Sequence, residues 1–296
     1  MKIIFLGCGY LGYNLSETLK KKHDVFVLGL ENEYSKRSLI FKNCDVFSDD
    51  IFKYKDLLKD AIVIDTLSLI SSTLNDQDDQ KILDNIKHKY DGLYSNLKEC
   101  EIKSYYFFSS GGTIYGDCTE KADETTDVRP VNLYAKSKLI IEELIKESYL
   151  EYLILRISNP YGGYQLTDKK QGVIPILIYK AIKNENFELW NDIDSTRDYL
   201  YISDLCKYIE LLIESDVKNE IINVASSKGV SMKEIFDILD NQSLKLNIIF
   251  KQSPTSIVHT IVLNTDKLKA ITKYEPMVSI EDGIISEIKR IKEELK

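Results

Sequence analysis

The chain has 296 residues, 44% of them hydrophobic, and a formal net charge of −8 at neutral pH. A chain of this length and composition can bury a large core, which argues against a disordered protein. The acidic net charge argues against nucleic acid or an anionic membrane as a partner, whereas a small anionic ligand depends only on the charge of its own site.

The N-terminus reads MKIIFLGCGYLG, and two glycines interrupt its hydrophobic start after a few residues. A signal-peptide core or a membrane span needs a longer apolar run. The five cysteines are widely spaced without a C-x-x-C pair, and the chain has only three histidines, so the pattern does not indicate a metal site. We expect a soluble, cytoplasmic protein without a bound metal.

In the first half of the chain, apolar runs of strand length alternate with longer stretches of helical period. This alternation predicts the α/β class, with a Rossmann-type doubly wound parallel sheet and helices on both of its faces. The expected strands are residues 2–6, 24–30, 61–66, 105–109 and 152–157, and the expected helices are residues 11–22, 81–100 and 133–148.

After residue 158 the pattern loosens, which predicts a smaller, mixed α/β C-terminal lobe over residues 159–296. Some of its segments are expected to return to the sheet of residues 1–158. The expected elements are a loop at 162–172, helices at 174–184, 203–214, 231–239 and 280–295, and short strands at 187–190 and 220–224.

A glycine motif, GCGYLG, follows the first expected strand and opens the first expected helix. Gly7, Gly9 and Gly12 form the pattern G-x-G-x-x-G. Glycines in this position allow a tight turn and a close approach of the backbone, so that the helix N-terminus can bind a pyrophosphate. A turn with a closely packed helix is the simpler alternative, and the position after an N-terminal strand favours a dinucleotide.

The end of the second expected strand bears on the kind of dinucleotide. An acidic residue there recognises the ribose 2′-hydroxyl of NAD. The segment VFVLGLENEYSKR offers Gly29, then Glu31, then Lys36 and Arg37. Glu31 favours NAD and the two cations favour NADP, unless they are solvated loop charges, so both cofactors stay open.

The segment YAKSK places Tyr134 and Lys138 one helical turn apart near the start of a helix. A phenol with a pKa of about 10 becomes an acid or base near neutral pH only if about three pKa units, roughly 4 kcal/mol, come from a nearby positive charge. A surface Tyr/Lys pair is a common chance occurrence. The preceding strand, however, ends in the cluster Ser109 to Tyr115, and ligands gather at such strand ends.

With these motifs in place, the sequence resembles the extended short-chain dehydrogenase/reductase superfamily, in its UDP-glucose 4-epimerase-like branch of nucleotide-sugar epimerases and dehydratases. The resemblance implies that residues 1–158 bind NAD or NADP and that residues 159–296 bind a nucleoside-diphosphate sugar. The segments that carry it are GCGYLG, FFSSGGTIYGD, YAKSK, LRISNPYGGYQ, QGVIP, ELWNDIDSTRDYLYISDL, INVASSKGVSMKEI and IEDGI.

The resemblance also assigns roles to single residues. Tyr134 resembles the catalytic acid/base, and Lys138 resembles the lysine that holds the nicotinamide ribose and lowers the pKa of the tyrosine. Asn159 and Arg197 resemble the residues that contact the substrate diphosphate and the nucleotide, although Arg197 could instead pair with Asp194 or Asp198. Further cofactor contacts are expected at Tyr10, Leu11, Glu31, Arg37, Asp45, Val46 and Leu67, and further substrate contacts at Ser110, Gly111, Thr113 and Val173.

The sequence departs from the family pattern at several points. Leu6 stands at the first glycine position of the phosphate loop, and Gly29 stands where an acidic residue is usual. Gly111 stands where the catalytic Ser or Thr is expected, so Ser110 or Thr113 must supply that hydroxyl. The chain also has no arginine between residues 251 and 267, where the family often has a second phosphate contact.

Several functions are compatible with these residues. A 4-epimerase would use Tyr134 and pass through a transient 4-keto sugar. The alternatives are a reductase of a nucleotide-linked 4-keto-6-deoxyhexose with NADPH, and a catalytically altered binding protein. A dehydratase is not expected, because Gly112 and Thr113 occupy the positions of its Asp-Glu pair. By analogy with the family, helices 81–100 and 133–148 are expected to form a homodimer interface.

Overall fold

The computed structural model describes residues 1–70, 79–166, 172–190, 192–251 and 258–296. These residues form two units that alternate along the chain. The first unit contains residues 1–110, 132–156 and 212–222, and the second contains residues 111–131, 157–211 and 223–296. The predicted boundary between residues 158 and 159 stays a prediction.

A seven-stranded sheet, built mainly from the first unit, has the strand order β10-β6-β5-β4-β1-β2-β3. The chain runs outward from β1 in both directions, and β1 is parallel to both of its neighbours, β2 and β4. The predicted doubly wound sheet is therefore confirmed. Its strands are β1 (Lys2–Leu6), β2 (Asp24–Gly29), β3 (Phe41–Asn43), β4 (Ile62–Asp65), β5 (Ser104–Ser110), β6 (Tyr152–Ile157) and β10 (Glu220–Val224).

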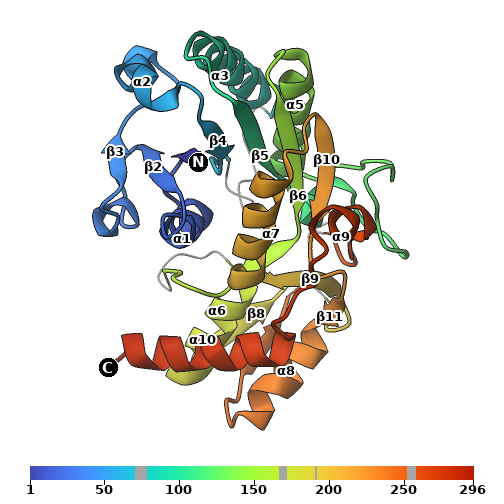
Figure 1. The fold of residues 1–296 in the computed structure, drawn as a ribbon. Coiled ribbons are helices and arrows are strands. Elements are labelled where there is room, and N and C mark those ends of the chain that lie inside the picture. The colour runs from blue at the N-terminus through green and yellow to red at the C-terminus, as the bar shows by residue number, and fades with distance from the viewer. Residues whose placement is uncertain (71–78, 167–171, 191, 252–257) are drawn as a thin grey trace. The chain divides into compact units, whose positions relative to one another are not determined.

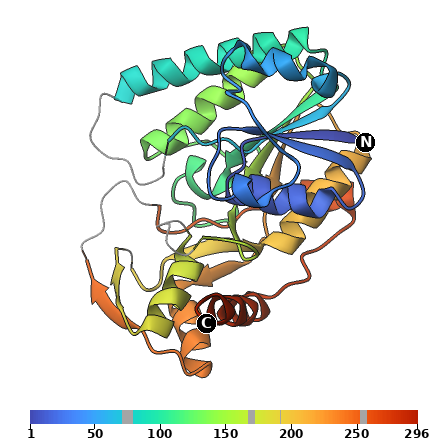
Figure 2. The same cartoon turned by 90° about the vertical axis from the view of Figure 1, so that its left-hand side faces the viewer.

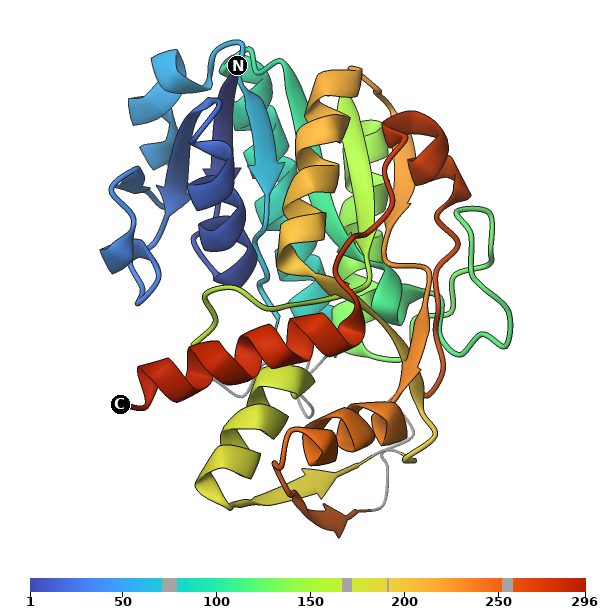
Figure 3. The same cartoon turned by 60° about the horizontal axis from the view of Figure 1, so that its bottom comes forward.

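Helices lie on both faces of this sheet, which explains why its central strands are continuous apolar runs. Helix α1 (Tyr10–Leu19) lies on one face, and α3 (Asp79–Glu99) and α5 (Leu133–Glu147) lie side by side on the other (Figures 1, 2 and 3). Helix α1 ends three residues earlier than expected, because the amides of Lys22 and His23 both bond to the Leu19 carbonyl and turn the chain toward β2.

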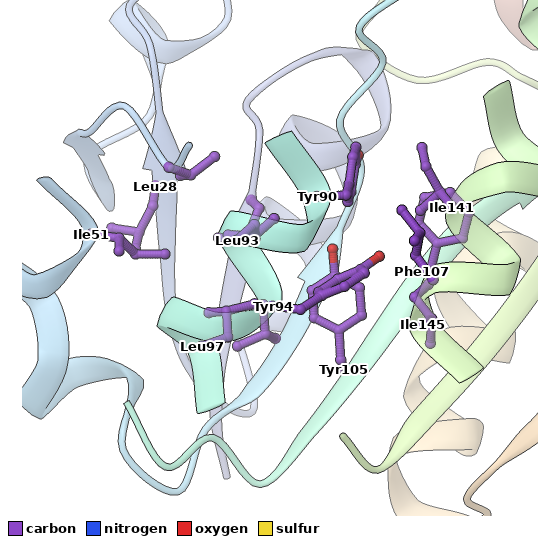
Figure 4. Close-up of a cluster of buried hydrophobic side chains, with 14 of the residues drawn as sticks. Leu28, Ile51, Tyr90, Leu93, Tyr94, Leu97, Tyr105, Phe107, Ile141 and Ile145 are labelled. Carbon is purple, nitrogen blue, oxygen red and sulfur yellow. The ribbon is translucent and has the colours of Figure 1, made fainter. Parts of the chain in front are cut away.

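The core of the first unit lies where α3 and α5 cover β5. Tyr90 and Tyr94 of α3 pack against Tyr105 and Phe107 of β5 (Figure 4). The rings of Tyr94 and Tyr105 meet edge to face, with their centroids 5.2 Å apart. Aromatic pairs of this kind add about 0.5–1.5 kcal/mol beyond the burial of their area, so this cluster fixes α3 on the sheet.

A buried ion pair ties α5 to two strands of the same sheet. Arg156 of β6 donates through Nε and Nη2 to the two carboxylate oxygens of Glu142, at 3.2 and 2.8 Å. The hydroxyl of Ser109, on β5, donates to the same carboxylate at 2.5 Å. The side chains of Arg156 and Glu142 are 6% and 2% exposed, so this network replaces water for both charges.

The second unit is mixed, as predicted for the C-terminal lobe. Strands β7 (Asn159–Tyr161), β9 (Thr196–Tyr201) and β11 (Gly229–Ser231) form one sheet, and β8 (Asn186–Leu189) pairs with β12 (Asn247–Phe250). Helix α10 packs against α6 and α8 (Figure 3). The helices of this unit are α4 (Gly111–Ile114), α6 (Val173–Lys183), α7 (Ile202–Ser215), which continues into the first unit, α8 (Met232–Asn241), α9 (Asp266–Thr272) and α10 (Ile280–Glu294).

Several short elements were not predicted. The missed strands are β3, β7, β9, β11 and β12, which have three to six residues each. The turns η1 (Ser35–Arg37) and η2 (Asp49–Tyr54) and helix α2 (Lys55–Leu58) were also missed. Of the expected loop at 162–172, residues 167–171 lie outside the described residues. In the described part of the chain, no helix has the length and apolar character needed to cross a bilayer.

The Glu142–Arg156 pair gives a stability prediction. Glu142→Ala leaves a buried guanidinium without its counter-charge, which should lower the free energy of unfolding by about 3–5 kcal/mol. Glu143→Ala, at the neighbouring exposed position of α5, is the control and should change it by less than about 0.5 kcal/mol. Urea denaturation measures both, and equal midpoints for the two variants would contradict the role of the pair.

Candidate active site

The three glycines of GCGYLG differ in backbone conformation and in the space around them. Gly7 has φ +92°, a conformation that L side chains rarely adopt. A Cβ on Gly12 would lie 2.1 Å from the Gly7 carbonyl oxygen, so no side chain fits there. A Cβ on Gly9 would meet nothing within 4 Å. The fold of the turn therefore requires Gly7 and Gly12, whereas the space beside Gly9 is open to a ligand.

The turn leaves the first amides of α1 without a side-chain cap. Gly9 is the N-cap of this ten-residue helix and supplies no side-chain cap to its first amides. Thr66 directly follows β4 and contacts the turn. Its hydroxyl lies within hydrogen-bond distance, 3.1 Å, of the carbonyl oxygens of Leu6 and Gly7. Tyr10 and Leu11, both half-buried, open the helix. Uncapped amides at a helix N-terminus are groups that can bind the phosphates of a dinucleotide.

The segments after β2 and β3 carry the other expected cofactor residues. Glu31 and Arg37 are exposed after β2, and Asp45 is exposed after β3 with Val46 buried beside it. Lys36 forms an exposed ion pair with Glu33 at 2.6 Å, as expected for a solvated loop charge. A Cβ on Gly29 would lie 3.4 Å from the Gly7 Cα, which is an ordinary contact, so the backbone at this position does not itself require a glycine.

Lys138 lies in the interior of the first unit, beside Tyr134. The side chain of Asn132 caps α5 by accepting from the amide of Ala135 at 2.9 Å, which sets the start of the helix. Lys138 is 4% exposed, and its Nζ donates to the carbonyl oxygens of Phe108 at 2.9 Å and Leu67 at 3.2 Å. Its Nζ also lies 5.7 Å from the centroid of the Tyr134 ring. The ammonium group is therefore fixed next to the half-buried phenol.

The hydroxyls at the end of β5 fall into two groups. Ser109 donates to the buried Glu142, so its hydroxyl is part of the core. Because side chains alternate along a strand, Ser110 faces away from that network. Ser110 belongs to the first unit, together with Tyr134 and Lys138, whereas the buried Gly111 and the half-buried Thr113 lie on α4 of the second unit.

The expected substrate residues Asn159 and Arg197 lie together in the second unit. Asn159 Nδ2 donates to the carbonyl oxygen of Asp198 at 2.9 Å. Arg197 donates through Nη1 to the Gly112 carbonyl at 3.4 Å and through Nη2 to the Val258 carbonyl. A Cβ on Gly112 would lie 3.3 Å from the Asn159 amide oxygen. Val173 is the first residue of α6 in the same unit.

The Arg197 guanidinium donates to two backbone carbonyls. Burial lowers the pKa of its guanidinium. Within the described residues no carboxylate lies within ion-pair distance of it, and the Asp198 carboxylate instead accepts from the amides of Ser226 at 2.9 Å and Ser227 at 3.0 Å. Burial also raises the pKa of Asp198 to about 6. Arg197 therefore does not form the alternative salt bridge to Asp198. An anionic ligand would pair with its charge.

Asp65 and Thr66, at the end of β4, were missed in the sequence. Asp65 is fully buried, and its carboxylate accepts from the hydroxyls of Tyr105 at 2.6 Å and Tyr90 at 3.1 Å and from the amide of Leu67 at 2.7 Å. The sequence signal that could have identified them is the pair of polar residues at the end of the apolar strand β4. Across the described ranges, no group of three or more His, Cys, Asp or Glu side chains could hold a metal ion.

Comparison with known proteins matches most of the chain to one family. Residues 4–225 match the model of the NAD dependent epimerase/dehydratase family. A Methanocaldococcus jannaschii protein named "Putative UDP-glucose 4-epimerase" is 28% identical over 302 residues, which cover 96% of each chain. The dTDP-4-dehydro-6-deoxyglucose reductase of Escherichia coli is 31% identical over 245 residues, which cover 77% of this chain and 75% of that protein.

Solved structures share the fold. The UDP-glucose 4-epimerase of Thermus thermophilus, crystallised with NAD, superposes with a TM-score of 0.87 at 22% identity and covers 99% of each chain. At this level of identity the likeness concerns the fold alone, and it extends over both units of the chain.

The glycine turn gives a pair of variants with opposite expected effects. Gly12→Ala gains up to about 1 kcal/mol of helix propensity but forces its Cβ against a backbone carbonyl, so a net loss of about 1–3 kcal/mol of stability is expected. Gly9→Ser should leave stability within about 0.5 kcal/mol, because serine caps helices well and meets nothing there. It should nevertheless weaken NADH binding at least about tenfold by filling the ligand space.

Thermal unfolding and NADH fluorescence titration measure the two properties separately. If Gly9→Ser binds NADH with the affinity of the wild type, the assignment of this turn as the dinucleotide site is wrong.

Proposed function

Because this chain belongs to the NAD dependent epimerase/dehydratase family, we propose that it is a nucleotide-sugar 4-epimerase of the UDP-hexose type, acting through a transient 4-keto sugar. The observation that carries the proposal is the buried Lys138 ammonium, held by two carbonyl oxygens beside the ring of Tyr134. The Methanocaldococcus jannaschii relative, which matches 96% of each chain, supports the choice of epimerase.

The proposed chemistry assigns Tyr134 to proton transfer. As a phenolate beside the Lys138 ammonium group, it takes the proton of the sugar C4 hydroxyl and later returns it. NAD, when bound, would supply the acceptor and the donor for the hydride of C4. Ser110 or Thr113 is proposed to donate a hydrogen bond to the C4 oxygen. The cycle consumes no net proton or hydride.

The proposed substrate site uses the second unit. Arg197 is half-buried, and within the described residues its charge has no carboxylate partner, so it is suited to the diphosphate or to an acidic sugar. Asn159 is held by the Asp198 carbonyl, which leaves its amide oxygen beside Gly112. Val173, at the start of α6, is proposed to line the same site.

A ketoreductase is the second candidate. The Escherichia coli relative, 31% identical over 77% of this chain, is named as a reductase of a dTDP-linked 4-keto-6-deoxy sugar. The same Tyr134/Lys138 pair would then protonate the 4-keto oxygen while NADH or NADPH is consumed. Gly29, which lacks the acidic group that rejects a 2′-phosphate, is the residue that favours this alternative.

The proposal includes location and assembly. All five cysteines lie among the described residues and none is in a disulfide, which suits the cytoplasm. Helices α3 and α5 lie side by side, and Tyr149, at the end of α5, is 90% exposed beside a groove lined by Asp91, Ser95 and Lys98. We infer a homodimer through this pair of helices.

Light scattering after size-exclusion chromatography should give twice the mass of the monomer. The Tyr149→Glu variant should give a mass closer to that of the monomer. A monomeric wild-type protein would contradict the dimer.

The catalytic assignment predicts a graded loss of activity. Tyr134→Phe should reduce kcat by at least about a thousandfold and leave NADH affinity unchanged, because only the proton-transfer group is removed. Ser110→Ala or Thr113→Ala should reduce kcat by about ten- to a hundredfold, depending on which hydroxyl acts. Steady-state rates with UDP-hexoses measure both effects, and full activity in Tyr134→Phe would refute the assignment.

A further inference from the structure

A buried polar network lies beneath Lys138 on the sheet side of α5. Asp65 ends β4 and accepts from the amide of Leu67 at 2.7 Å, which fixes the turn that follows the strand. That turn presents the Leu67 carbonyl oxygen to Lys138 Nζ at 3.2 Å. Tyr90 and Tyr105 complete the network by donating to the other carboxylate oxygen of Asp65.

We propose that Asp65 is a positioning residue for Lys138, which it serves in two ways. It holds the turn that carries the Leu67 carbonyl, and it supplies a buried negative charge that attracts the Lys138 ammonium group. This inference rests on the proposed function, since the position of Lys138 matters only if Lys138 acts on the dinucleotide and on Tyr134.

The hydrogen bonds around Asp65 indicate a carboxylate. Two phenol hydroxyls and one amide donate to its two oxygens, and a deprotonated carboxyl group accepts all three. The titratable groups that face it are Tyr90 and Tyr94 from α3, Tyr105 from β5 and Lys138 from α5. Lys138 is the one cation in this set, so the network joins one negative and one positive charge inside the core.

The energetics separate this role from a purely structural one. Burial is the largest influence on Asp65 and raises its pKa, against the opposing effects of Lys138 and the three hydrogen bonds. The folded protein thus holds this proton more tightly than the unfolded chain, so ionisation of Asp65 lowers stability as the pH rises above about 4. A buried charge that costs stability is better explained by what it does for Lys138 than by what it does for the fold.

The decisive variant is Asp65→Asn, which keeps the shape and the acceptor for the Leu67 amide but removes the charge. Phenol oxygens can accept from the new amide group. At neutral pH the thermal midpoint should stay equal or rise, while kcat should fall about tenfold and the NADH dissociation constant should rise several-fold. Loss of a negative charge also favours deprotonation of every neighbouring group, so both limbs of the pH profile of kcat should move to lower pH.

Two phenols of the same cluster give a matched pair. Tyr105→Phe removes the 2.6 Å hydrogen bond to Asp65 and should move NADH affinity and kcat in the same direction as Asp65→Asn, by a smaller factor. Tyr94→Phe is the control, because Tyr94 is buried in the same cluster and packs on the Tyr105 ring, whereas the hydroxyls that donate to Asp65 are those of Tyr90 and Tyr105. It should behave like the wild type within about twofold.

The outcomes distinguish this inference from the proposed function. If the wild type binds NADH but turns over no nucleotide sugar, the proposed function fails, and the NADH affinities of the three variants still test the role of Asp65. Asp65→Asn and Tyr105→Phe with unchanged NADH affinity would overturn the inference. An Asp65→Asn variant that unfolds would also contradict it, because stability is expected to be kept.

Discussion

One buried ammonium group organises the candidate site of the first unit. Lys138 Nζ reaches from α5 to the Phe108 carbonyl at the end of β5 and the Leu67 carbonyl after β4. These contacts join one helix to the carboxyl ends of two parallel strands, where ligands of doubly wound sheets bind. A buried cation is costly unless it is well paired, so the surrounding network of carbonyls, Asp65 and phenols is what makes its position possible.

Two buried polar networks inside the first unit position α5. Glu142, one helical turn beyond Lys138, anchors the helix to β5 and β6 through Ser109 and Arg156. Asp65 acts at the other end, near the proposed chemistry. In the first network the buried charges of Glu142 and Arg156 pair with each other, so removal of either partner should destabilise the fold. In the second network burial raises the pKa of Asp65, so the charge of Asp65 costs stability. This difference is typical of functional sites.

Much of this organisation was predictable from the sequence because it is local. Strand β1 was predicted with its exact ends, since an apolar run stops at Gly7, and the positions of Tyr134 and Lys138 on one helix face follow from their spacing. The partners of these residues were not predictable. The carbonyls that bind Lys138 come from residues 71 and 30 positions away, and those of Arg197 from residues 85 and 61 positions away. Backbone carbonyls leave no mark in a sequence, and the short strands of the second unit pair only through such distant contacts.

The measurement that tests the account most directly follows the hydrogen on C4 of the sugar. The purified protein is incubated with UDP-glucose carrying deuterium at C4, and the products are analysed by mass spectrometry and by sugar separation. The account predicts UDP-galactose that retains the deuterium, with no net change in the dinucleotide. Loss of the deuterium to solvent, or the absence of any conversion while NADPH is consumed with a 4-keto-6-deoxy sugar, would contradict it.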